Sequence, residues 1–171
     1  MTQRTMTQRT VTQRRRTIAV LALACTLGVA GCSSSSEPNA CSLLDQGTIV
    51  EGAGVAVEKG KIDADLSTDT VSVCAWRPTS GTFPVIMVYL SAGGDQVGAQ
   101  RLEAEKGFGV PSVDVTVAGA RDAYAAGNGS LIGMVVDDHF VQVSYLTTGT
   151  EDALDKTAPL AAEAAARLAA K

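Results

Sequence analysis

His139 is the only histidine of the chain, and it follows two carboxylates, Asp137 and Asp138. A histidine beside carboxylates serves acid–base and nucleophilic catalysis when a nucleophile is held on an exposed turn. The chain has no Gly-x-Ser-x-Gly segment, the turn that exposes a nucleophilic serine in many hydrolases. We therefore predict that His139 lies at a solvated hairpin tip, with a weak surface metal site at these three residues as the alternative. No catalytic residue is predicted.

A second acidic group, Asp63, Asp65 and Asp69, has the spacing that opens a calcium-binding loop. The sixth and twelfth positions of that loop would be Thr68 and Cys74, where calcium loops need Gly and a bidentate Glu. No segment carries the three-glycine pattern of nucleotide binding between a strand and a helix. The sequence therefore predicts a solvated acidic loop, with no metal and no cofactor.

The first 31 residues have the organisation of a secretory signal. Arg14, Arg15 and Arg16 precede an apolar run at 18–30, which is the order of a basic region and a hydrophobic region. A helix of that run is about 20 Å long, which is too short for an ordinary membrane span. We expect residues 1–31 to direct export and to be removed.

The end of this signal resembles the lipobox of bacterial lipoproteins, on the residues Val29-Ala30-Gly31-Cys32. The resemblance implies that Cys32 carries a diacylglyceryl thioether and becomes the N-terminus of the mature protein. An ordinary signal peptide with a cysteine at this place is the alternative. Two or more acyl chains anchor a protein stably to a membrane, whereas one chain does not. The expected location is extracytoplasmic, at the outer face of the cytoplasmic membrane, with residues 32–40 as a Ser-rich tether and 41–171 as one domain.

Four cysteines occur in the chain, and their positions assign different roles to them. Cys25 lies inside the signal, and Cys32 is the expected lipidation site. Cys41 and Cys74 remain as a lone pair in an exported chain, which favours a disulfide between them. A metal site and free thiols are the alternatives, although two cysteines and one distant histidine make a poor set of metal ligands.

Charge separates the signal from the rest of the chain. All 18 acidic residues follow residue 31, together with nine of the 14 basic residues, so the mature part carries a net charge of about −9. Such a charge argues against nucleic acid and against an anionic membrane surface as the main partner. The membrane is expected as a partner only through the lipid anchor at Cys32.

The apolar pattern predicts one α+β domain with a mostly antiparallel sheet of about six strands, in the order α-β-β-β-α-β-β-β-α. Asp95 is the predicted N-cap of the central helix and Gly107 its end. Pro159 is expected to kink or divide the last helix. The predicted elements are a helix at 41–51, strands at 55–58, 71–77 and 83–90, a helix at 95–106, strands at 113–117, 131–136 and 139–146, and a helix from 151. The strand at 83–90 is almost wholly apolar, which predicts cover on both faces.

Two aromatic residues are the candidates for a binding surface. Trp76 lies two residues from Cys74 on a predicted strand, so both face one side, where Trp76 belongs either to the core or to a ligand pocket. Tyr124 lies in a Gly- and Ala-rich segment that we predict to be a loop. It is either exposed or a plug over the edge of the sheet.

Three patches of sequence resemble one family when taken with the lipobox. They are Ala40-Cys41-Ser42-Leu43-Leu44, Cys74-Ala75-Trp76 and Val117-Ala118-Gly119-Ala120-Arg121-Asp122-Ala123-Tyr124. Together they are similar to a family of small exported actinobacterial lipoproteins, the domain-of-unknown-function family 3558. Where that family often has Pro and Gly-Leu-Gly-Asp, this chain has Ala40 and Gly119-Ala120-Arg121-Asp122. The resemblance implies the location and the disulfide, and it brings no catalytic residues.

These observations favour a lipid-anchored, non-catalytic module that binds another envelope protein. A carrier for a small apolar or lipid ligand is the alternative, and a hydrolase is the third hypothesis. A carrier needs a large apolar cavity, and we expect instead a dry, filled core.

Overall fold

A computed structural model describes residues 39–148 and 152–171. The signal segment, the lipobox with Cys32 and most of the tether lie outside the described residues. Ala40, which we assigned to the tether, belongs to the folded domain, because it is fully buried and begins a short helix. The elements are η1 (Ala40–Ser42), α1 (Gln46–Ala53), β1 (Lys61–Ile62), β2 (Val71–Trp76), β3 (Val85–Ala92), η2 (Gly94–Gln96), α2 (Val97–Phe108), β4 (Val113–Asp114), β5 (Arg121–Ala126), β6 (Leu131–Val136), β7 (His139–Leu146) and α3 (Leu154–Ala169).

One antiparallel sheet organises the described residues. Its seven strands have the order β1-β2-β3-β7-β6-β5-β4, and each neighbouring pair is antiparallel. The pairing of β3 with β7 joins an N-terminal group of strands to a C-terminal group. The predicted α+β class and antiparallel sheet are confirmed, and the predicted order of elements lacks one strand.

The hairpin of β6 and β7 forms where the sequence predicts it. The two strands have the predicted bounds, and Val136 pairs with His139 across the turn. Asp137 takes a φ of 49°, a left-handed conformation that Asp tolerates better than most residues. All six residues of β6 are buried, because helices cover both faces of this part of the sheet.

The missed strand is β5, in the segment that we predicted to be a loop. Its sequence, Arg-Asp-Ala-Tyr-Ala-Ala, has little intrinsic preference for a strand. A register shift between Arg121 and Tyr124, with Asp122 at a φ of 53°, also breaks the regular alternation. The predicted strand at 113–117 is reduced to the two residues of β4. Packing between the sheet and its helices determines this region more than local propensity does.

The N-terminal part also differs from the prediction in two places. Residues 55–58 do not form a strand, since only Val57 makes an isolated bridge, to Pro78. The short strand β1 lies instead at the start of the predicted acidic loop that carries Asp63, and it pairs Lys61 with Ala75. Such a short edge strand offers few free backbone groups to another chain.

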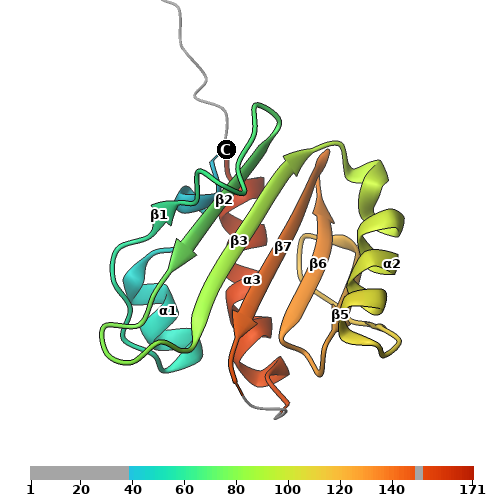
Figure 1. Cartoon of the computed structure of the whole chain (residues 1–171). Coiled ribbons are helices and arrows are strands. Elements are labelled where there is room, and N and C mark those ends of the chain that lie inside the picture. The colour runs from blue at the N-terminus through green and yellow to red at the C-terminus, as the bar shows by residue number, and fades with distance from the viewer. Residues whose placement is uncertain (1–38, 149–151) are drawn as a thin grey trace, which may run out of the picture. The chain divides into compact units, whose positions relative to one another are not determined.

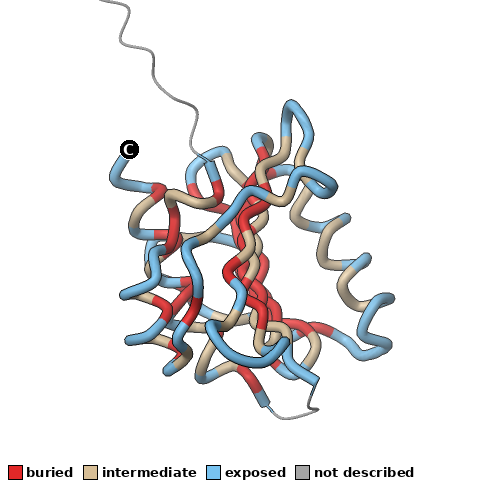
Figure 2. The backbone as a smooth tube through the Cα atoms, turned by 60° about the vertical axis from the view of Figure 1, so that its left-hand side comes forward, coloured by how far each residue is buried: buried red, intermediate tan, exposed pale blue. Residues whose placement is uncertain are grey.

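The helices form two layers of unequal extent around the sheet (Figure 1). Helices α1 and α3 pack together, and α3 covers β6 and β7 on one face. Helix α2 lies on the opposite face and contacts β5 and β6. Buried positions are concentrated in the sheet and under α3, whereas no residue of α2 is buried (Figure 2).

Both predicted ends of α2 are wrong, and the predicted division of α3 does not occur. Asp95 does not cap α2, because it lies inside the preceding η2 turn. Gly107 is inside α2, and the helix ends at Gly109, whose φ of 70° is the left-handed conformation that ends many helices. Pro159 does not divide α3, which continues from Leu154 to Ala169. Its ring lies on the exposed side near the start of α3, so that few backbone hydrogen bonds are lost.

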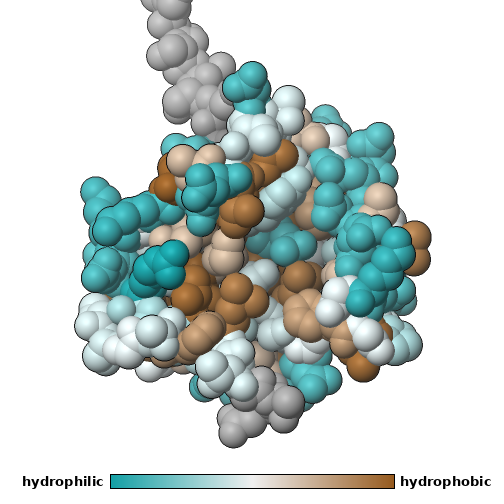
Figure 3. Space-filling view, viewed as in Figure 1, coloured by the Kyte–Doolittle hydropathy of each residue, from teal (hydrophilic) through white to brown (hydrophobic). Residues whose placement is uncertain are grey.

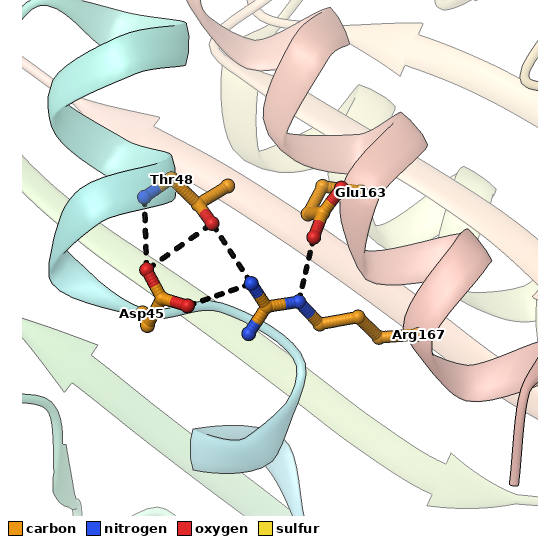
Figure 4. A network of polar contacts seen from close by, with 4 residues as sticks. All are labelled: Asp45, Thr48, Glu163 and Arg167. Carbon is orange, nitrogen blue, oxygen red and sulfur yellow. Dashed lines mark hydrogen bonds and ion pairs between the residues drawn. The ribbon is translucent and has the colours of Figure 1, made fainter.

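A network of polar contacts fixes the start of α1 to the end of α3 (Figure 4). The Asp45 carboxylate caps α1 by accepting from the Thr48 backbone N–H at 2.9 Å. Arg167 of α3 donates through Nη2 to Asp45 at 2.7 Å and to the Thr48 hydroxyl at 3.0 Å, and through Nε to Glu163 at 2.6 Å. The Thr48 N–H and the Arg167 guanidinium lower the pKa of Asp45 to about 2.

We expect this network to make stability depend on pH in a narrow acidic range. Because the pKa of Asp45 is lower in the folded chain than in an unfolded one, its ionised form stabilises the fold above about pH 4. The contribution is lost as the pH falls through about 2. In denaturant unfolding at several pH values, Asp45→Asn, which keeps a capping oxygen, should be less stable than the wild type at pH 6 and equal to it near pH 2. A difference that stays constant over this range would contradict the assignment.

Candidate functional site

The predicted disulfide is present and belongs to the framework of the domain. Cys41 of η1 and Cys74 of β2 are bonded, with their Cα atoms 5.0 Å apart. The bond closes a loop of 33 residues in sequence, and the chain-entropy model gives such a loop a stabilisation of about 3–4 kcal/mol. The disulfide therefore ties the N-terminal turn of the described domain to its sheet.

Trp76 belongs to the core and not to a surface. It is 1% exposed and lies on the α3 side of the sheet with Cys74. A Cβ added at Gly60 would lie 2.5 Å from the Trp76 ring and 2.9 Å from the sulfur of Cys74. The backbone at Gly60 thus closes over both residues, and the binding-surface assignment of Trp76 is corrected.

Tyr124 is also fully buried, so its assignment to an exposed loop is wrong. It stands on β5 between the sheet and α2, and its ring lies over Gly133 of β6, where an added Cβ would come within 2.5 Å of the ring. The Arg101 guanidinium lies 5.6 Å from the ring centre. Burial raises the pKa of Tyr124 to about 12. The alternative, a plug over the edge of the sheet, is right that Tyr124 covers the sheet but wrong in its place, because the ring lies over β6, within the sheet and not at its edge.

The acidic and histidine groups form no metal-binding cluster in the described part of the chain. Asp63 accepts from the backbone N–H groups of Asp65 and Leu66, as in an ordinary turn. His139 is half-buried at the start of β7, not at a solvated tip, and its Nδ1 is buried without a hydrogen-bond partner among the described residues. Within residues 39–148 and 152–171, no three His, Cys, Asp or Glu side chains gather closely enough to hold a metal ion.

An exposed part of the sheet, which the sequence did not reveal, is the candidate site. Successive residues of β2, β3 and β7 alternate between the two faces. On the α3 side, Ile86, Val88 and Val143 are completely buried. On the α2 side, Val73, Phe140 and Ser144 are buried as well, but other residues of the same strands remain half-exposed, because α2 contacts mainly β5 and β6. We call this surface the open face; its half-exposed side chains are Val71, Ala75, Met87, Tyr89, Gln142 and Leu146.

The strand register joins these side chains into one surface. Met87 lies between Ala75 of β2 and Ser144 of β7, and Tyr89 lies between Val73 and Gln142. Figure 3 shows apolar surface over the middle of this side of the molecule, with hydrophilic side chains at both borders. Cover on both faces of the strand at 83–90 was therefore a wrong prediction. A run of apolar residues indicates that both faces of a strand are apolar. It does not indicate that other elements cover both faces.

The two borders of the open face differ in charge. At the α2 border, Arg101 is already paired, with Asp114 at 2.6 Å and with Glu105 at 3.7 Å. At the β1 border, a pocket of about 190 Å³ brings Ala75 together with the basic residues Lys59, Lys61 and Arg77 and with Glu58, Ile62 and Asp63. Lys61 pairs with Glu58 at 3.6 Å.

Lys59 and Arg77 are exposed and form no ion pair within the described residues. Asp63 in the same pocket has no ion pair among these residues either, and its carboxylate accepts from the backbone N–H groups of Asp65 and Leu66. Within the described part of the chain, the β1 border therefore keeps two unpaired cations against one unpaired carboxylate.

No family model, curated protein or solved structure matches this chain. In the described part of the chain, no helix has the length and apolar character needed to cross a membrane. The assignment of the open face as the candidate site therefore rests on the geometry of the structure alone.

The contact of Tyr124 with Gly133 predicts a specific cost of substitution. Gly133→Ala places a methyl group against the buried ring, and we expect a loss of about 1–3 kcal/mol in the free energy of unfolding. Gly98→Ala on α2 meets no atom within 4 Å and should leave stability unchanged or slightly raised. In a Tyr124→Leu background the cost of Gly133→Ala should largely disappear. If urea unfolding gives the same loss of stability for Gly133→Ala in both backgrounds, the Tyr124 ring is not what opposes the added methyl group.

Proposed function

We propose that this protein is a lipid-anchored, non-catalytic binding module of the cell envelope. The observation that carries the binding role is the open face, an apolar surface on a disulfide-tied sheet that the domain's own helices leave uncovered. Exposed apolar surface of this kind is typical of interaction sites. In this proposal the partner is another envelope protein, which covers the open face.

The export and anchoring part of the proposal rests on the sequence and on the disulfide. Disulfides persist in oxidising compartments outside the cytoplasm, which agrees with the signal-like segment before Cys32. The resemblance to exported actinobacterial lipoproteins points the same way. The lipid at Cys32 holds the domain near the membrane, and the tether at 33–38 reaches at most about 20 Å when fully extended.

Removing the sulfur of Cys32 should separate anchoring from folding. In Cys32→Ser we expect an unprocessed or released protein without acyl chains, because the thioether cannot form. Mass spectrometry of the protein from the membrane and soluble fractions measures this, with Cys25→Ser as the control that keeps lipidation. Acyl chains on Cys32→Ser would overturn the anchor.

Binding at the open face should be detectable in the native envelope. With a photoreactive amino acid at Met87 of the anchored protein, we expect irradiation to yield a discrete cross-linked adduct with another protein. The matched control is Ala166, which is exposed on α3, on the other side of the sheet. Adducts at Ala166 and none at Met87 would contradict the proposed face. A cross-link to lipid instead of protein at Met87 would favour the carrier.

A further inference from the structure

We infer that the open face takes one amphipathic α-helix of a partner protein, with acidic residues along the border that meets Lys59 and Arg77. The inference rests on the proposed function and names the chemistry of the partner. It follows from the width of the uncovered surface, from the polar groups in its floor and from the charge at its border.

The open face is one helix wide. Neighbouring strands lie about 4.8 Å apart, so β2 and β7, on either side of β3, are separated by about 10 Å. An α-helix with its side chains has a diameter of about 10–12 Å, and packed helices lie about 8–10 Å apart. Because α2 lies on β5 and β6, the next helix position in the same layer is over β3 and β7.

The length of the surface also suits a helix. Strand β3 has eight residues, which extend over about 26 Å. A helix of about 17 residues covers that distance. A partner helix with apolar residues at every third or fourth position would place them over Met87, Tyr89 and Leu146.

The floor is not purely apolar, which favours a protein helix over an acyl chain. Gln142 is half-exposed in the middle of the open face, and its Nε2 lies 3.5 Å from the Ser144 hydroxyl. An acyl chain offers this amide no further hydrogen bond, so it would bury the remaining polar groups of the amide at a cost in free energy. A helix offers polar side chains that can pair with it.

Charge selects an acidic partner. Lys59 and Arg77 stand at the β1 border without ion pairs among the described residues, and Ala75 connects this border to the apolar floor. An acidic row on the helix would pair with these cations, and charge complementarity of this kind fixes the orientation of a partner.

Two designed peptides test the inference directly. Both have 17 residues, a stripe of Leu and one charged row, which is Glu in one peptide and Lys in the other. Glu and Lys have similar helix propensities, so the peptides differ mainly in charge. Fluorescence anisotropy reports their binding to the full-length lipoprotein in lipid nanodiscs, with empty nanodiscs as the blank. We expect the Glu peptide to bind at least about tenfold more tightly, a ratio that falls as salt is added.

Three variants locate the binding. Arg77→Glu should remove the preference for the Glu peptide, and since Arg77 is exposed the fold is not at risk. Met87→Glu should weaken both peptides. Leu102→Glu is the control, because Leu102 is 58% exposed on α2, outside the open face, and should bind as the wild type does.

Several results would overturn the acidic helix. Equal binding of the two peptides, or an Arg77→Glu variant that keeps the preference, would exclude it. A stoichiometric lipid that co-purifies with the wild type but not with Met87→Glu would make lipid the occupant. A dimer that Met87→Glu dissociates would make it a second copy. If the Met87 cross-link forms in the envelope while the peptides bind equally, only the helix chemistry is wrong; without the cross-link the proposed function fails.

Discussion

In the described residues, three α-helices are too few to cover both faces of a seven-stranded sheet. The rest of the described structure depends on this shortage of cover. Helices α1 and α3 bury one face so completely that Ile86, Val88 and Val143 have no exposed surface. Among the described residues, α2 is the single α-helix on the other face, and it lies on β5 and β6. An antiparallel sheet can leave one face in water, but apolar residues on that face gain free energy when another molecule covers them. The strands β2, β3 and β7 therefore offer half-exposed apolar surface to another molecule.

Contacts on the covered side of the sheet explain why the strands of the open face keep their positions without a helix over them. The Cys41–Cys74 disulfide ties η1 to β2, and the Arg167 network ties α1 to α3. Both lie away from the open face, so the strands that form it are supported from behind. A preorganised surface of this kind loses little conformational entropy when a partner binds.

The sequence predicted elements whose signals are local and missed those that depend on packing. The β6–β7 hairpin was predictable because two apolar runs flank Asp137 and Asp138. The buried stripe of α3, with Ala161, Ala165 and Leu168, was predictable from its helical spacing. Strand β5 was missed because its Ala-rich sequence forms a strand only when α2 and β6 enclose it.

The open face could not be predicted for a related reason. Periodicity tells which residues of a strand share a face, but not whether a helix from elsewhere in the chain covers that face. Tyr124 looked accessible among Gly and Ala residues, yet it is fully buried, and Gly133, which has no side chain, leaves the space for its ring. Met87 and Tyr89 looked buried within an apolar run, yet α2 does not extend over them. In both cases the exposure of the side chain depends on whether a helix lies over that part of the sheet.

The two methionines that follow the signal segment allow a direct measurement of the central claim, that the open face is exposed in the isolated protein and covered in the envelope. Met87 is half-exposed on the open face, and Met134 is completely buried. Mild peroxide treatment, followed by mass spectrometry, compares their oxidation to the sulfoxide. The account predicts that Met87 oxidises much faster than Met134 in the purified lipoprotein and is protected in intact envelopes. Equal oxidation of Met87 in both preparations, or a resistant Met87 in the purified protein, would contradict it.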